Sequence, residues 1–343
     1  MTTLVTGATG FVGSHVARQL LAAGHSVRAL VRPASNTKSL EGLPVERAEG
    51  DLRDVISIDR AMRDVRWVFH VAADYRLWAR NPREIYESNV EGTHRLFEVA
   101  AQNGVERIVY TSTVATMAVP GHGHELPNED TVATVGEMIG HYKRSKFLAE
   151  LEAIKAASQG IPVVIVNPTA PVGPGDWKPT PTGKIIVDFL NGKMPAYVDT
   201  GLNLVAVEDV AAGHLLAAKK GRIGERYILG ARNMTLRQIL EALAKITGRS
   251  APHVRLPHAV ALAAAYADEL FSRLAGREPR IPVEGVKMSR HRMFVASDKA
   301  ERELGYHPGA VEAALERAVR WYEAQGYVGG AAKAKPLAQV TAA

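Results

Sequence analysis

Short β-branched runs alternate with amphipathic helical patterns along the first half of the chain. In the segment 11–24, apolar residues recur at Val12, Val16 and Leu20, and Gly24 follows as a helix stop. Strands that alternate with helices of this length predict βαβ units, so we expect an α/β fold built on a doubly wound parallel sheet. The predicted strands are 2–7, 26–32, 45–51, 66–72, 107–113 and 162–168, and the predicted helices are 11–24, 56–62, 90–104 and a segment that includes 141–146.

The pattern changes after Pro168. Residues 169–183 are rich in proline and glycine, which predicts a loop, whereas 235–325 carry mainly helical patterns. We expect a smaller, mainly helical carboxyl-terminal lobe that covers the carboxyl edge of the sheet and holds the substrate. The predicted parts are a cofactor-binding domain at 1–168 with 203–230 returning to it, a substrate lobe at 169–202 and 231–328, and a disordered tail at 329–343.

The composition is that of a globular protein, with 46% apolar and 23% charged residues. The chain has no cysteine, which excludes a disulfide framework, a thiolate zinc site and an iron–sulfur cluster. The amino terminus lacks the features of a signal peptide, and the most apolar later run, 259–266, is far shorter than the about 20 residues of a membrane span. We therefore expect a cytoplasmic protein with no integral membrane segment.

The net charge adds little to this picture. The 42 lysines and arginines exceed the 36 aspartates and glutamates by six and are scattered along the chain, whereas a nucleic-acid-binding protein concentrates its basic residues. We expect no nucleic-acid partner, and an anionic small molecule such as a phosphorylated cofactor accounts for the excess. The 12 histidines show no metal-binding spacing, so we expect no metal site.

A glycine-rich loop joins the first predicted strand to the first predicted helix, with the spacing G-x-x-G-x-x-G. Glycine is needed where a backbone turns tightly against a pyrophosphate, and the helix N-terminus then faces the negative charge. Because strand, helix and βαβ pattern agree, we prefer a dinucleotide site in a Rossmann domain to three glycines in an ordinary turn. The cofactor-binding residues predicted in this loop are Gly7, Thr9, Gly10, Phe11, Val12 and Gly13.

Arg32 ends the second predicted strand, where an acidic residue usually contacts the ribose of NAD. An arginine offers a planar fork to a 2′-phosphate instead, and Lys38 follows on the same loop. We therefore prefer NADP(H), with NAD(H) still possible and a solvated basic loop as the alternative reading of these charges. Further cofactor contacts are predicted after the third and fourth strands, at Asp51, Leu52, Ala72 and Ala73.

Tyr142 and Lys146 are four residues apart, which places them on one face of a helix. With the glycine loop and the segments "GDLRD", "HVAA", "TST" and "YKRSK" in this order, the chain resembles the extended short-chain dehydrogenase/reductase superfamily. The resemblance covers most of the chain. It implies a catalytic set of Thr113, with Ser112 as the alternative, Tyr142 as the acid/base and Lys146 as its partner.

The chemistry of this set follows from acidity. A free tyrosine has a pKa of about 10 and is a poor base at neutral pH. A close ammonium and an oxidised nicotinamide both favour the phenolate, so Lys146 should lower the pKa of Tyr142. Thr113 would donate to the substrate oxygen and stabilise the charge that develops there. By the resemblance, Tyr142 and Lys146 also contact the cofactor, and Pro168 and Thr169 line the nicotinamide.

Longer segments, at 73–80, 139–150 and 178–205, resemble the bacterial hopanoid-associated sugar epimerase family, which is itself similar to dihydroflavonol reductases. Asn167 resembles the asparagine of sugar-nucleotide epimerases, but Val164 stands where those enzymes tend to carry an arginine. This difference argues against a nucleotide sugar. The segment "HVAA" and Arg32 instead resemble the dihydroflavonol reductase and 3β-hydroxysteroid dehydrogenase branches, which implies an apolar ring ketone. The predicted substrate contacts are Tyr75, Trp78, Asn167 and Tyr197.

Three functions follow from these patterns. The first is an NADP(H)-dependent reductase or dehydrogenase acting on a carbonyl or alcohol, and the second is a sugar or nucleotide-sugar epimerase or dehydratase with tightly bound NAD(P). The third is a non-catalytic NADP(H)-binding sensor, which would need no Tyr142–Lys146 pair. The resemblance also implies a homodimer. Lys143 and Arg144 are expected to be ordinary surface charges, and the helix at 256–276 is expected to pack over the pocket.

Overall fold

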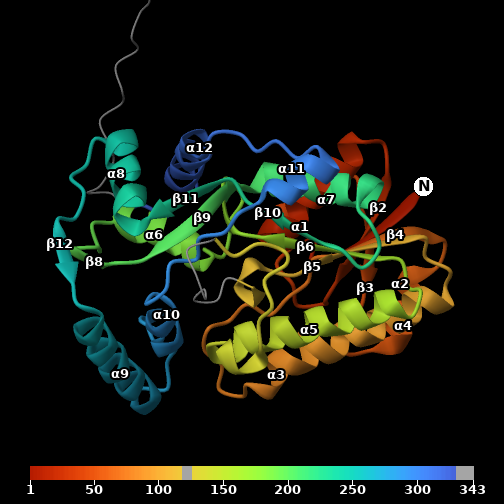
Figure 1. Cartoon of the computed structure of the whole chain (residues 1–343), viewed down its shortest axis with the longest axis horizontal. Coiled ribbons are helices and arrows are strands. Elements are labelled where there is room, and N and C mark those ends of the chain that lie inside the picture. The colour runs from red at the N-terminus through yellow and green to blue at the C-terminus, as the bar shows by residue number, and fades with distance from the viewer. Residues whose placement is uncertain (118–125, 330–343) are drawn as a thin grey trace, which may run out of the picture.

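A seven-stranded sheet forms the centre of the computed structural model, which describes residues 1–117 and 126–329 (Figure 1). The strand order is β10-β6-β5-β4-β1-β2-β3, and all neighbouring strands run parallel. The predicted tail lies outside the described residues, apart from Gly329. The strands are β1 (Thr2–Thr6), β2 (Ser26–Val31), β3 (Glu46–Glu49), β4 (Val65–His70), β5 (Arg107–Thr111), β6 (Val163–Pro168) and β10 (Arg226–Leu229).

Helices cover both faces of this sheet. In Figure 1, α1 (Phe11–Ala22), α7 (Val207–Lys220) and α11 (Asp298–Leu304) lie on one face, and α2 (Val55–Met62), α4 (Gly92–Gln102) and α5 (Gly140–Ser158) lie on the other. Successive side chains of a strand point to opposite faces of the sheet. Accordingly, one buried cluster contains Val5 and Phe69, and the cluster on the other face contains Leu4 and Val68. The doubly wound α/β fold predicted from the sequence is confirmed.

A local capping signal marks where α2 begins. α2 begins after Asp54, whose carboxylate accepts a hydrogen bond of 3.1 Å from the Ile56 N–H. The helix predicted at 90–104 is present as α4, and the chain before it is already helical from α3 (Arg83–Tyr86) through a π-helical turn at Glu87–Glu91. Short 3-10 turns lie at Lys38–Leu40, Val114–Thr116 and Val135–Glu137.

The remaining elements form a smaller lobe, at the left of Figure 1. Its core combines Phe189, Leu204, Leu240 and Leu315, which come from four different elements. A three-stranded sheet has the order β11-β9-β7, and β12 pairs with β8. The elements are β7 (Ala170–Val172), α6 (Pro181–Leu190), β8 (Ala196–Val198), β9 (Gly201–Ala206), β11 (Arg232–Thr235), α8 (Leu236–Thr247), β12 (Val254–Leu256), α9 (His258–Leu274), α10 (Val283–Met288) and α12 (Val311–Ala324).

Two expectations about the boundary between domain and lobe are wrong. The segment expected to be a loop contains β7, which pairs in parallel with β9. Of the segment 203–230 expected to return to the large sheet, 203–206 belong to β9 in the second sheet, whereas α7 and β10 do return. A three-residue strand among prolines and glycines is too short to show the alternation by which strands are recognised.

Helix α9 contributes little to the core. Ala265 and Ser272 are buried, but Leu270, Phe271 and Leu274 are 63%, 61% and 82% exposed. The helix was expected to pack over the pocket. Its carboxyl-terminal apolar side chains are exposed, and the turn that follows it, at 276–278, lines a cavity. Within the described residues, no helix combines the length and apolarity needed to cross a membrane.

Candidate active site

The glycine loop between β1 and α1 has backbone contacts that only glycine permits. Gly7 has a φ of +70°, and a Cβ atom there would lie 2.6 Å from the Ala72 nitrogen. A Cβ on Gly13 would lie 2.1 Å from the Gly7 carbonyl oxygen. Gly10 is the N-cap of α1, where no side chain caps the helix. The first N–H groups of α1 are therefore free to bind a pyrophosphate. The small residue Ala72 packs against Gly7 of this loop.

The end of β2 presents the predicted 2′-phosphate contacts. Arg32 is exposed, one residue past the end of β2. Asp51 accepts hydrogen bonds from the Arg53 guanidinium at 2.9 and 2.8 Å, and this pairing, with a smaller effect of Arg32, lowers the pKa of Asp51. The Lys38 ammonium lies 4.1 Å from the ring centroid of Trp177, a residue of the segment between β7 and α6. Arg32 and Asp51 are thus neighbours in the folded chain, while Lys38 stacks on the lobe.

Tyr142 and Thr113 meet at the carboxyl edge of the sheet. Thr113 follows β5, and Tyr142 lies in the first turn of α5. Burial raises the pKa of Tyr142, and a hydrogen bond with the Thr113 side chain opposes this shift. The Ser112 hydroxyl, in contrast, is buried without a hydrogen-bond partner among the described residues. The structure therefore brings Thr113, rather than the alternative Ser112, to the tyrosine.

Lys146, one helical turn after Tyr142 in α5, is buried. Its ammonium donates to the Tyr110 hydroxyl at 2.9 Å and to the Thr111 carbonyl at 2.8 Å. Burial lowers the pKa of Lys146 to about 7, against a smaller raising effect of Glu150. The sequence-based expectation that the ammonium lowers the pKa of Tyr142 is not met, because desolvation of the phenol dominates and the ammonium bonds to Tyr110 and Thr111.

A buried polar network holds the turn that carries Thr113. The Asn167 amide donates to the Thr113 carbonyl at 3.1 Å and to the Glu150 carboxylate at 2.7 Å. Glu150 also accepts from the Thr116 hydroxyl at 3.1 Å. Asn167, predicted to contact substrate, is 0% exposed and holds the backbone beside the site. Sequence reasoning missed Tyr110 and Glu150, although Glu150 lies four residues after Lys146, a spacing that could have indicated the contact.

Asn89 is a second residue that sequence reasoning missed. It lies in the π-helical turn before α4, and its side chain donates to the Ser145 hydroxyl at 2.9 Å and accepts from the Asp74 N–H at 2.7 Å. It thereby ties the loop after β4 to α5, the helix that carries Tyr142. The π turn is the feature that aims Asn89, and no local sequence pattern marks it.

The lobe contacts the amino-terminal end of α5. Glu284 of α10 accepts a hydrogen bond of 3.3 Å from the His141 N–H, where a carboxylate complements the helix dipole. A Cβ on Gly140, whose φ is +82°, would lie 2.1 Å from this carboxylate. His141 itself is 3.2 Å from the Tyr86 hydroxyl. The position of α10 is therefore linked to the helix that carries Tyr142.

Lys143 departs from its expected place. It is only 8% exposed, and its ammonium lies 3.5 Å from the sulfur of Met293, in the segment after α10. Burial lowers its pKa to about 8. The expectation of an ordinary surface charge is wrong, because the lobe segment at 291–295 folds over this side of α5; Arg144 is exposed as expected.

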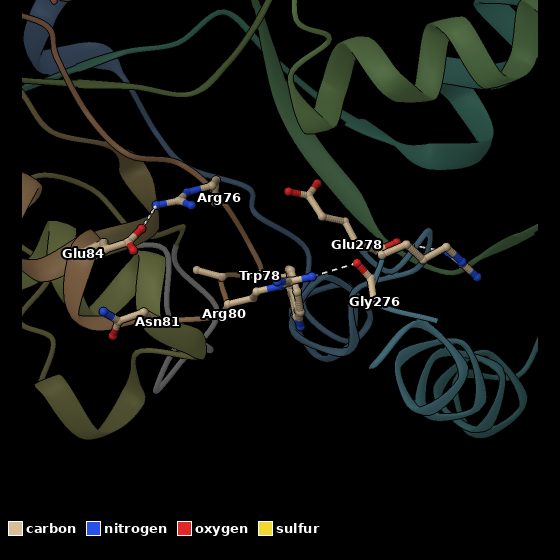
Figure 2. A pocket seen from close by; sticks show the side chains of 9 residues that line it. Arg76, Trp78, Arg80, Asn81, Glu84, Gly276 and Glu278 are labelled. Carbon is tan, nitrogen blue, oxygen red and sulfur yellow. Dashed lines mark hydrogen bonds and ion pairs between the residues drawn. The ribbon is translucent and has the colours of Figure 1, made fainter. Parts of the chain in front are cut away.

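The predicted substrate contacts do not all converge. Tyr75 is 38% exposed, and burial together with the charges of Asp176 and Asp74 raises its pKa, with a smaller effect of Tyr142. Trp78 lines a cavity of about 370 Å³ between the loop after β4 and the turn after α9. In Figure 2, Arg80 reaches across this cavity to the Gly276 carbonyl, at 2.8 Å. The other residues that line it are Arg76, Ala79, Asn81, Glu84, Arg277 and Glu278.

The remaining predicted site residues are Tyr197, expected to contact the substrate, and Pro168 and Thr169, expected to line the nicotinamide. Tyr197 lies in β8 and packs against the core of the lobe. Pro168 ends β6, and the Thr169 hydroxyl is 3.4 Å from the Leu229 carbonyl. The described residues contain no group of three or more histidine, aspartate or glutamate side chains suited to a metal ion. The residues that meet at one edge of the sheet are therefore the glycine loop, Thr113, Tyr142 and Lys146.

Comparison with known proteins agrees with this geometry. The model of the NAD dependent epimerase/dehydratase family matches residues 3–230. A putative dihydroflavonol 4-reductase of Synechocystis is 47% identical over 328 residues, which cover 94% of this chain and 95% of the relative. Sterol demethylase protein B of Methylococcus capsulatus is 37% identical over 96% of this chain and 100% of its own length. Among solved structures, a nucleoside-diphosphate-sugar epimerase of Pseudomonas aeruginosa matches with a TM-score of 0.80 at 28% identity, over 96% of this chain and 99% of the other.

Proposed function

Because the chain belongs to the NAD dependent epimerase/dehydratase family, whose members are NAD(P)-dependent enzymes, we propose that it is an NADP(H)-dependent ketone reductase with Tyr142 as the general acid. The observation that carries this proposal is the Tyr142 phenol, which is hydrogen-bonded with the Thr113 side chain and whose pKa burial raises. A phenol whose pKa is raised keeps its proton at neutral pH, which is the state that carbonyl reduction requires. The relative named as a putative dihydroflavonol 4-reductase supports a reductase that acts on a ring ketone.

Reduction of a carbonyl requires a hydride, a proton and stabilisation of the charge on oxygen, and each has a proposed source. NADPH, when bound, supplies the hydride for the carbonyl carbon. Tyr142 transfers its phenolic proton to the carbonyl oxygen, so that the C=O bond becomes a C–H and an O–H bond. The Thr113 hydroxyl hydrogen-bonds the same oxygen and stabilises its developing negative charge. Lys146, one helical turn after Tyr142 and bonded to Tyr110 and Thr111, would contact the bound cofactor.

The cofactor preference rests on Arg32. Gly7, Gly10 and Gly13 would hold the pyrophosphate, and Arg32, exposed beside them, would form a bidentate contact to a 2′-phosphate. Asp51, which is predicted to lie near the adenine, is paired with Arg53, so its negative charge is already neutralised. These features favour NADP(H) over NAD(H). A cytoplasmic location and a homodimer stay predictions from the sequence.

An epimerase is the second candidate, favoured by the match to a nucleoside-diphosphate-sugar epimerase over nearly the whole chain. The two functions differ in their use of cofactor. A reductase consumes NADPH in proportion to product, whereas an epimerase returns the hydride and consumes none.

A substrate panel tests the proposal. The purified protein is incubated with NADPH and, separately, with a dihydroflavonol, a steroid ketone and nucleoside-diphosphate sugars, while NADPH absorbance and product are followed. We expect NADPH loss equal to alcohol formed with at least one ring ketone. Interconversion of sugar nucleotides without net cofactor change would instead establish the epimerase.

A further inference from the structure

Lys143 is a buried cation beside the proposed general acid. It directly follows Tyr142 in α5, yet its side chain points to the lobe, where the ammonium contacts the Met293 sulfur at 3.5 Å. A thioether sulfur is only a weak hydrogen-bond acceptor. Burying an ammonium against such a partner is unfavourable unless something else compensates the charge.

No such compensation comes from the residues that the structure describes. Among them the Lys143 ammonium has its polar contact with the Met293 sulfur and forms no ion pair, and burial accounts for its lowered pKa. The neighbouring His291 offers no negative charge: burial lowers its pKa, and the positive charges of Lys143 and Arg290 lower it further. Lys299 provides a contrast within the same chain, because this lysine, whose side chain is 14% exposed, pairs with Glu225 at 2.6 Å.

Lys143 and Tyr142 border the same turn of the chain. The Tyr142 hydroxyl bonds to Thr113, at the start of that turn. Met293, which contacts Lys143, packs against the buried cluster that includes Val114 and Met117 of the same turn. The ammonium thus lies where the lobe meets the carboxyl edge of the sheet, which is where doubly wound folds bind their ligands.

We propose that Lys143 is a substrate-binding residue, which holds an anionic oxygen group, a carboxylate or a phosphate, of the molecule whose carbonyl Tyr142 protonates. This inference rests on the proposed function for the reacting carbonyl, but not for the anion. An anionic substituent would displace the weak contact to Met293 and neutralise the buried charge. The substrate class is therefore a ketone that carries an acidic group on its lobe-facing side.

The first test needs no turnover. With NADP⁺ saturating the dinucleotide site, thermal unfolding is followed while inorganic phosphate or benzoate is added to the wild type, Lys143→Met, Lys143→Gln and Lys155→Met. Lys155 lies on the same helix with a side chain 57% exposed, so its variant matches the loss of charge without loss of a buried cation. We expect one of the two anions to raise the unfolding temperature saturably in the wild type and Lys155→Met, with at least tenfold weaker binding in both Lys143 variants.

The response to each probe identifies the group, since benzoate reports a carboxylate site and phosphate a phosphate site. Equal binding by the wild type and the Lys143 variants, or no saturable binding of either anion, would overturn the proposal. So would a lower unfolding temperature of Lys143→Met than of the wild type without anions, since that would mark the lysine as structural.

A kinetic arm separates this proposal from the proposed function. A ketone that bears a carboxylate and its methyl ester are compared with NADPH. We expect the wild type and Lys155→Met to have a lower KM for the acid than for the ester. In Lys143→Met the ratio of the two KM values should fall at least tenfold. Absence of turnover with every ketone would count against the reductase, whereas the anion titration would still decide the role of Lys143.

Discussion

The buried ammonium of Lys146 donates a hydrogen bond of 2.9 Å to the hydroxyl of Tyr110, which is 0% exposed and lies in the middle of the sheet. The Tyr110 ring contacts His70 and Phe97, so the hydroxyl is held in place by its surroundings. One strand residue thus supports the lysine, and the turn that follows the same strand supplies Thr113.

Replacing Tyr110 by phenylalanine keeps the ring and removes this acceptor. Without it the ammonium is less stabilised, so the pKa of Lys146 falls further below its present value of about 7. If catalysis needs the charged form, the alkaline limb of the pH profile of kcat should move to lower pH, and kcat at neutral pH should fall roughly tenfold, as for loss of one charged hydrogen bond. Tyr306→Phe is the control, because that hydroxyl has no partner among the described residues. An unshifted profile in Tyr110→Phe would contradict the assigned role.

Arg32→Ala tests the cofactor preference. Removing a charge-assisted contact to the 2′-phosphate should weaken NADPH binding by roughly 10- to 100-fold and leave NADH binding nearly unchanged. Binding can be measured by fluorescence titration of the reduced nicotinamide. Arg47→Ala, at an exposed arginine of the neighbouring strand β3, should affect neither cofactor. Equal losses for both cofactors in Arg32→Ala would show that the arginine does not read the phosphate.

Gly13→Ala tests the packing of the glycine loop. The new methyl group would lie 2.1 Å from the Gly7 carbonyl oxygen, so the loop or the start of α1 must move. We expect loss of measurable dinucleotide binding and a clearly lower unfolding temperature. At Gly136 the nearest atom to an added Cβ is a Thr134 side-chain oxygen at 3.8 Å, so Gly136→Ala should resemble the wild type. Tight cofactor binding by Gly13→Ala would be inconsistent with the loop geometry.

Lys143→Met should stabilise the protein in a pH-dependent way. Burial lowers the pKa of Lys143 from its ordinary value of 10.5 to about 8 in the folded chain, so between these pH values the unfolded chain binds more protons. Wild-type stability therefore rises with pH from about 8 to 10.5, and the cost of the buried charge is complete below about 8. At neutral pH the variant should be more stable, by up to roughly 3 kcal/mol, and the difference should shrink as the pH rises.

Urea unfolding of both proteins below and above pH 8 measures this difference, with Lys155→Met as the matched control. His291, which faces Lys143, keeps a lowered pKa and titrates on the acid side of this range. A constant difference across the range would contradict a buried, charged Lys143.

Sequence reasoning recovered what short-range patterns encode. The strands, the glycine loop and the Tyr142–Lys146 spacing are local, so alternation and turn chemistry sufficed to predict the sheet and its carboxyl edge. Burial of Lys143 and the acceptor role of Tyr110 depend on contacts between residues far apart in the chain: Met293 is 150 positions from Lys143, and Tyr110 is 36 from Lys146. The local sequence does not distinguish an exposed helix face from one that a distant segment of the chain covers.

The place of Asn167 illustrates the same limit. A family resemblance assigned it to the substrate, but its amide is committed to Glu150 and the Thr113 carbonyl inside the protein. Its influence on the substrate would act through the position of Thr113. Such a role follows from three-dimensional contacts that no spacing in the sequence reveals.

Single-turnover reduction of a responsive ring ketone by Tyr142→Phe, beside the wild type and with NADPH saturating, tests the central claim most directly. Phenylalanine keeps the ring and removes the proton that the reduction needs. The account predicts NADPH binding within about twofold of the wild type and a rate lower by roughly 100- to 10,000-fold, the usual contribution of a general acid. Full turnover by Tyr142→Phe would contradict it.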